Sequence, residues 1–171
     1  MSEIRIQKNE TEKLQKKDAG ADFESFRQII ETLRSENGCP WDRAQTLESL
    51  KPCMVNEMTE AIAGIDLYRK SGNAENLCEE LGDVLLQVVL LSQIAKEEGL
   101  FDIDDVIRKI SKKMEHRHPH VFGTPEEREK KRSWEELKRE EKGNRSKEEE
   151  DAQRTAFHEA AGFVICHLAE K

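Results

Sequence analysis

Two pairs of acidic residues on either side of a turn signal constrain the fold of this chain most strongly. Glu57 and Glu60 are three residues apart, and Glu80 and Asp83 repeat that spacing after the turn sequence at residues 70–73. Residues at positions i and i+3 share one face of a helix, so each pair points its two carboxylates in the same direction. The stretch therefore predicts two antiparallel helices joined by a short turn.

The two acidic pairs are expected at the same height in this hairpin. Since a helix rises about 1.5 Å per residue, Glu60 lies roughly 18 Å from the centre of the turn and Asp83 roughly 16 Å. Four like charges facing one small volume destabilise a fold, and the apolar run at residues 84–91 predicts burial as well. A divalent cation relieves this repulsion, and carboxylate oxygens suit Mg2+. We therefore expect a site for Mg2+, with Mn2+ able to substitute, formed by Glu57, Glu60, Glu80 and Asp83. Salt bridges on a solvated face are the alternative for Glu57 and Glu60.

Composition excludes several classes of protein. At 171 residues the chain is long enough for one domain with a sizeable core. Its net charge of −8 argues against a general nucleic-acid binder. The sequence has no apolar run of about 18 residues and no apolar signal region at its start, so we expect a soluble, cytoplasmic protein with no membrane span. The four cysteines form no CxxC pair and are expected to be free thiols.

Helical periodicity extends through most of the chain, and no segment has a convincing strand pattern. The expected helices are residues 22–36, 52–70, 74–98, 103–116, a short one from 133, and 152–169. The connections include a turn at 39–42, a charged loop at 124–132 and a solvated linker at 144–151.

These elements predict an all-α protein built as an antiparallel helical bundle. Residues 1–20 are expected to be a polar tail, 21–142 the helical domain, and 143–171 a linker with a C-terminal helix of unknown role. The helix after the turn is apolar on too many sides for its neighbours in one chain to cover. We therefore expect a homodimer or a higher homo-oligomer, in which a partner subunit completes the bundle.

Five short stretches carry a resemblance to a known family. They are Gly38-Cys39-Pro40-Trp41-Asp42 followed by Gln45-Thr46; Glu57-x-x-Glu60; Glu79-Glu80-Leu81-Gly82-Asp83; Arg117-His118-Pro119-His120-Val121-Phe122; and Trp134-Glu135-x-x-Lys138. In this order they resemble the MazG-type nucleoside triphosphate pyrophosphohydrolases, over about residues 23–142. The resemblance implies an all-α fold in which two subunits build a helical bundle. It also implies Mg2+-dependent cleavage of a nucleoside triphosphate to a monophosphate and pyrophosphate.

The resemblance also implies roles for particular residues. The four acids would hold metal ions that neutralise the phosphates and activate water for attack at the α-phosphorus, and one Glu would orient or deprotonate that water. Basic positions of the family, expected to meet the outer phosphates, fall on Lys113, Arg117 and Lys138; for Lys113 and Lys138 ordinary surface charge is the alternative. Trp41 is expected to stack near the base, with core packing as its alternative.

One position departs from the family pattern. The family usually has two adjacent acids at the start of its first acidic pair, and the first of them is Asn56 here. Asn56 offers an oxygen without charge, which predicts weaker binding of an accessory metal. A catalytically weakened helical module, acting in oligomerisation or regulation, is therefore the alternative function.

Two other metal motifs are incomplete. Glu115-x-x-His118 has the spacing of a di-iron bundle, but no second motif of that kind lies on a comparable helix. His158-Glu159-Ala160-Ala161-Gly162 resembles the zinc helix of metalloproteases, but Gly162 replaces the second histidine. We therefore expect neither di-iron chemistry nor a zinc protease.

Overall fold

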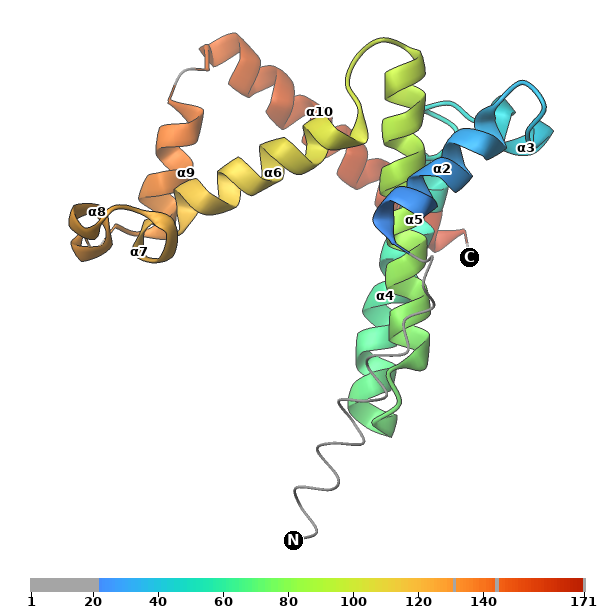
Figure 1. Cartoon of the computed structure of the whole chain (residues 1–171), viewed down its shortest axis with the longest axis horizontal. Coiled ribbons are helices and arrows are strands. Elements are labelled where there is room, and N and C mark those ends of the chain that lie inside the picture. Colours follow the sequence, from blue (N-terminus) through green and yellow to red (C-terminus); the bar gives the residue numbers. More distant parts are fainter. Residues whose placement is uncertain (1–21, 131, 144, 171) are drawn as a thin grey trace, which may run out of the picture. The chain divides into compact units, whose positions relative to one another are not determined.

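The computed structural model describes residues 22–130, 132–143 and 145–170, and every regular element within them is a helix (Figure 1). The expected all-α fold is thereby confirmed. The chain divides into two compact units between Gln45 and Thr46. The polar tail expected at residues 1–20 lies outside the described residues.

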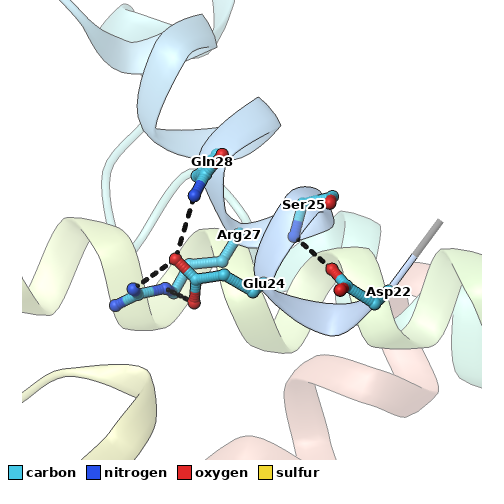
Figure 2. A network of polar contacts seen from close by, with 5 residues as sticks. All are labelled: Asp22, Glu24, Ser25, Arg27 and Gln28. Atoms are coloured by element: carbon cyan, nitrogen blue, oxygen red, sulfur yellow. Dashed lines mark hydrogen bonds and ion pairs between the residues drawn. The ribbon is translucent and has the colours of Figure 1, made fainter. Parts of the chain in front are cut away.

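The unit that ends at Gln45 contains α2 (Phe23–Arg34) and α3 (Pro40–Ala44). Asp22 caps α2, since its carboxylate accepts a hydrogen bond of 2.8 Å from the backbone N–H of Ser25 (Figure 2). This bond holds the pKa of Asp22 below its ordinary value. The Arg34 guanidinium donates to the backbone carbonyl oxygens of Asp42 and Gln45 and so ties the end of α2 to α3. The turn expected at residues 39–42 is wrong, because Pro40 begins the short helix α3 and only Cys39, its N-cap, lies outside that helix.

The second unit is organised around the predicted hairpin, formed by α4 (Lys51–Ser71) and α5 (Glu75–Glu97), which lie side by side in Figure 1. Gly72 ends α4 with a φ angle of 73°, a left-handed conformation that glycine adopts without strain. Gly64 allows the two helices to approach closely, because a Cβ atom there would lie 3.2 Å from the Cα of Leu77 on α5. The hairpin predicted from the turn signal is confirmed.

The elements that follow the hairpin begin with α6 (Ile103–Arg117), which Asp102 and Asp105 cap reciprocally as a capping box. After it come α7 (Pro119–Phe122), α8 (Pro125–Glu129), α9 (Trp134–Lys142) and α10 (Lys147–Ala169). Helix α9 packs against α6, and α10 packs against α4. Within the described residues, no helix is long and apolar enough to cross a membrane.

Two connections predicted as irregular are helical. The expected charged loop at 124–132 contains α8, because Thr124 and Glu127 cap each other's backbone N–H groups and Pro125 is already fixed in a helical φ. The expected linker at 144–151 is wrong for the same reason, since Ser146 and Glu149 form a capping box that starts α10 at Lys147. In both cases the cap stabilises a helix whose first turn carries no apolar side chain other than that of Pro125.

Candidate metal centre

Three of the four predicted acids meet across the hairpin. Glu57 and Glu60 come from successive turns of α4 and Glu80 comes from α5, and one carboxylate oxygen of each lies within 4.8 Å of the others. Glu57 and Glu80 are half-buried, whereas Glu60 is exposed. We call these residues the glutamate cluster. The cluster forms because Glu57 and Glu60, three residues apart on α4, face α5 at the distance from the turn at which Glu80 lies.

The position of Glu80 is fixed by its neighbours. Asn76, one turn earlier on α5, donates a hydrogen bond of 2.8 Å from Nδ2 to Oε1 of Glu80. A Cβ atom at Gly64 would lie 3.3 Å from Oδ1 of the same Asn76. The absence of a side chain at Gly64 therefore lets α4 approach the part of α5 that supports the Glu80 carboxylate.

Asp83 lies outside the glutamate cluster. It is half-buried on α5, three residues beyond Glu80, but it does not belong to the group whose oxygens lie within 4.8 Å of one another. Its side chain is one methylene shorter than that of a glutamate, so it reaches less far from the helix axis. The role of Asp83 as a metal ligand stays a prediction.

The donor atoms of the cluster fit a hard divalent cation. All three ligands are carboxylate oxygens, which Mg2+, Mn2+ and Ca2+ prefer, whereas zinc sites favour nitrogen and sulfur. The cluster has one exposed member and two half-buried ones, which leaves it accessible to a substrate. Among the described residues, this is the one group of three or more acids, histidines or cysteines with ligand atoms close enough to share an ion.

Arg117, expected to meet phosphate, is paired within the fold. Its guanidinium donates two hydrogen bonds, of 2.8 and 2.5 Å, to the carboxylate of Glu141 on α9. It also lies 4.9 Å from the centre of the Trp134 ring. The pair lowers the pKa of Glu141 and raises that of Arg117, chiefly through these hydrogen bonds. Arg117 thus connects α6 to α9.

The other predicted substrate residues occupy varied surroundings. Lys138 lies 3.8 Å from the Glu135 carboxylate, one turn earlier on α9. Lys113 is exposed on α6, where its charge contributes to the lowered pKa of Glu141. Trp41 belongs to α3 in the first unit and is 60% exposed, so the alternative of core packing does not hold within that unit.

A contact that sequence reasoning missed involves Asn56. Nε2 of His167 on α10 lies 2.9 Å from Oδ1 of Asn56, and the two residues are 111 positions apart in the chain. Asn56 immediately precedes Glu57, so α10 reaches the edge of the glutamate cluster. No local pattern indicates a contact over such a separation. The only signal was that an amide replaces the family's acid at this position.

The sequence of this chain is similar to that of a known protein family. Residues 45–122 match the family model described as the MazG nucleotide pyrophosphohydrolase domain, a stretch that includes all four predicted acids. The chain is 50% identical over 129 residues to a protein of Thermotoga maritima named nucleoside triphosphate pyrophosphohydrolase/pyrophosphatase MazG, an alignment that covers 75% of this chain and 49% of that protein. It is 40% identical over 122 residues to the nucleoside triphosphate pyrophosphohydrolase of Escherichia coli K12, covering 69% of this chain and 45% of that protein. The chain thus spans about half the length of these curated relatives.

Proposed function

The chain belongs to the MazG family through its domain over residues 45–122, and we propose that this domain hydrolyses nucleoside triphosphates to nucleoside monophosphates and pyrophosphate, with Mg2+ as its cofactor. The observation that carries the proposal is the glutamate cluster, since it brings three carboxylates of the family stretch within 4.8 Å of one another. Mn2+ is expected to substitute for Mg2+, because both bind oxygen ligands.

The charges of site and substrate explain why a cation is needed. A triphosphate and a cluster of carboxylates are both anionic, so they repel each other unless a cation lies between them. When bound, divalent ions would neutralise the phosphate oxygens and make a water molecule a better nucleophile. Glu57, Glu60 and Glu80 would hold the ions, and Asp83 is proposed as a further ligand from the next turn of α5.

The reaction assigned to this site is an in-line displacement at the α-phosphorus. The oxygen of the water forms a bond to the α-phosphorus, and the bond from that phosphorus to the oxygen bridging to the β-phosphorus breaks. One of the glutamates of the cluster orients the water and accepts its proton. The electron pair of the broken bond leaves with the bridging oxygen, so the products are the monophosphate and pyrophosphate.

Binding of the outer phosphates is assigned to the basic residues of α6 and α9. Lys113 is exposed, and Lys138 makes a 3.8 Å ion pair with Glu135, so each lysine can turn to a phosphate at little cost. Arg117 has a stronger bidentate pair with Glu141. We assign Arg117 one of two roles: it binds a phosphate that displaces Glu141, or it keeps its bond to Glu141 and holds α9 beside α6. Trp41 is assigned to stacking near the base.

A homodimer accounts for the apolar surface of the hairpin. Large apolar side chains between 42% and 59% exposed follow both helices: Met58, Ile62, Ile65, Leu67 and Tyr68 on α4, and Leu81 and Leu85 on α5. A soluble monomer rarely exposes so many neighbouring apolar side chains. A second copy of the chain would cover them in a closed, symmetric assembly. A monomeric mass by light scattering at micromolar concentration would contradict this assignment.

A panel of nucleoside triphosphates tests the proposed function. The protein is incubated with each triphosphate and Mg2+, and monophosphate and pyrophosphate are quantified by ion-exchange chromatography. We expect the two products in equal amounts, no product with EDTA, and a loss of at least about a hundredfold in Glu57→Gln. No release from any triphosphate would favour the alternative of a weakened helical module. Release of diphosphate and inorganic phosphate would assign the attack to a different phosphorus.

A further inference from the structure

The contact between His167 and Asn56 joins the C-terminal helix to the helix that carries the acidic site. Nε2 of His167 lies 2.9 Å from Oδ1 of Asn56, and both side chains are half-buried. Helix α10 lies beyond residues 45–122, the stretch matched by the family model. The contact thus joins a residue outside the family stretch to Asn56, the residue that precedes Glu57.

Apolar side chains of α10 and α4 face each other across a cavity near this contact. Its inner face contributes Ala160, Phe163 and Val164 to a cavity of about 550 Å3, whose opposite wall includes Met54 and Val55 of α4. The ring of Phe163 stacks on the imidazole of His167, with centroids 5.8 Å apart and planes 9° from parallel. The imidazole is therefore held on one side by an aromatic ring and on its edge by Asn56.

The chemistry of the two groups fixes the direction of the hydrogen bond. Oδ1 of an amide only accepts, so Nε2 of His167 carries the proton and donates. The oxygen of Asn56 is then engaged by His167, and Nδ2 of Asn56, with its two N–H groups, is the part of the amide left to meet a ligand. A carboxylate at this position offers two oxygens and no donor. Asn56 instead offers two N–H donors, because its oxygen is engaged by His167.

Asn56 lies next to the glutamate cluster along α4. It precedes Glu57 directly and shares a helix face with Glu60, four residues later. An N–H donor at the edge of three carboxylates cannot bind a cation, but it suits an anionic oxygen that the cation brings to the site. In the reaction proposed above, that oxygen belongs to a phosphate.

We propose that His167 is a positioning residue, which orients Asn56 as a hydrogen-bond donor to a phosphate oxygen of the bound triphosphate. This inference rests on the proposed function for the identity of the ligand. Asn56 is then a substrate-binding residue of this chain and not a weakened metal ligand, and α10 is part of the site.

Substitutions at His167 test the positioning role through steady-state kinetics. His167→Gln keeps an N–H donor near the position of Nε2, whereas His167→Leu keeps bulk and removes the donor. We expect His167→Leu to raise the KM for the triphosphate on the order of fivefold, with kcat within about twofold, and His167→Gln to restore the wild-type KM. Ile165→Ser, on the same helix and 70% exposed, is the control and should leave both constants unchanged. An unchanged KM in His167→Leu, or an equal defect in His167→Gln, would overturn the proposal.

Asn56→Asp separates a donor from a metal ligand. If Asn56 donates to phosphate, a carboxylate there weakens binding of an α,β-methylene triphosphate analogue in the presence of Mn2+, as measured by calorimetry. If Asn56 is a weakened ligand, the same change strengthens Mn2+ binding and leaves the affinity for the analogue unchanged. The second result would overturn the proposal.

Nuclear magnetic resonance of the wild-type protein supplies a readout that needs neither a variant nor turnover. The long-range 1H–15N spectrum distinguishes the two neutral histidine tautomers, and we expect His167 to carry its proton on Nε2. We also expect the side-chain amide signals of Asn56 to shift when the analogue binds with Mn2+. A proton on Nδ1, or amide signals indifferent to the bound analogue, would refute the positioning role. If the analogue binds in this way and no triphosphate is hydrolysed, the proposed function fails and the positioning role stands.

Discussion

Replacing Glu80 by Gln should stabilise the metal-free protein and weaken its response to a divalent cation. The change keeps the size of the side chain and an oxygen that accepts from Asn76, but it removes one of the charges of the glutamate cluster. Two unit charges 4.8 Å apart repel by about 0.9 kcal/mol at the dielectric constant of water. Glu80 faces two such charges, and screening by about 0.1 M salt leaves roughly 1 kcal/mol in total.

The response to metal should change in the opposite direction. A cation at about 100 times its Kd stabilises the folded wild-type protein by roughly 2.7 kcal/mol. Loss of one carboxylate ligand that weakens the cation about tenfold removes roughly 1.4 kcal/mol of this gain. For a chain of this length, each kcal/mol corresponds to about 2–4 °C in melting temperature. With EDTA, Glu80→Gln should therefore melt a few degrees above the wild type, and with saturating Mn2+ it should gain less than the wild type gains.

Thermal melting by circular dichroism, with EDTA and with a Mn2+ series, measures both effects. Glu79→Gln is the matched control, because Glu79 is the neighbouring residue on α5, is exposed and lies outside the cluster. It should leave the response to Mn2+ unchanged. If Mn2+ and EDTA leave the melting of the wild type unchanged, or if both variants respond alike, the reasoning from converging charges is refuted.

Three further changes have expected outcomes. Asp83→Asn should reduce pyrophosphate release at least about a hundredfold without destabilising the metal-free protein, whereas intact turnover with a loss of about 3 kcal/mol in unfolding free energy would identify a buried ion pair. Gly64→Ala should destabilise the fold by roughly 1–2 kcal/mol in denaturant titrations, because overpacking against α5 outweighs the higher helix propensity of Ala. Gly162→Ala, where an added Cβ has no atom within 4 Å, should stabilise the fold by up to about 1 kcal/mol. Equal effects of the two substitutions would contradict the close approach of α4 and α5 at Gly64. Arg117 lowers the pKa of Glu141 in the folded protein. The ion pair therefore stabilises the fold at pH values above the ordinary glutamate pKa of about 4.3, and this stabilisation is lost as the pH falls through the lowered pKa of Glu141. The wild type should therefore melt above Glu141→Gln at neutral pH and lose this advantage below about pH 4, and a constant difference would contradict it.

The part of the fold set by local chemistry was predictable from sequence. The hairpin followed from the turn at residues 70–73 and the spacing of the acids, and the αL conformation of Gly72 is what that turn requires. The starts of α6 and α9 followed from Asp102 and Ser133, which cap them. These features depend on residues at most four positions apart, where helix geometry decides which groups meet.

Helix α8 and the start of α10, at residues 147–151, were not predicted as helix. Apart from Pro125, helix α8 and the first turn of α10 consist of charged residues, and this composition favoured a loop and a linker. The capping boxes at Thr124 and Ser146 carry the signal, since each satisfies two backbone N–H groups at once. These capping boxes, and not the spacing of apolar residues, predict α8 and the start of α10.

Contacts between distant segments were beyond sequence reasoning. The bond from His167 to Asn56 spans 111 residues, and the pair of Arg117 with Glu141 spans 24. The distance of each acid from the turn, measured along its helix, predicted that Glu57, Glu60 and Glu80 lie close together. Whether Asp83 joins them depends on the rotation of α5 about its axis and on the length of each side chain. Neither quantity follows from the spacing of residues along one helix.

The central claim is that the glutamate cluster supports attack of water on the α-phosphorus of a nucleoside triphosphate. Hydrolysis in 18O-labelled water, with the products analysed by mass spectrometry, tests it most directly. The account predicts one 18O atom in the monophosphate and none in the pyrophosphate for the wild type, and no labelled product above background for Glu57→Gln. Label in the pyrophosphate, or undiminished labelled monophosphate from Glu57→Gln, would contradict it.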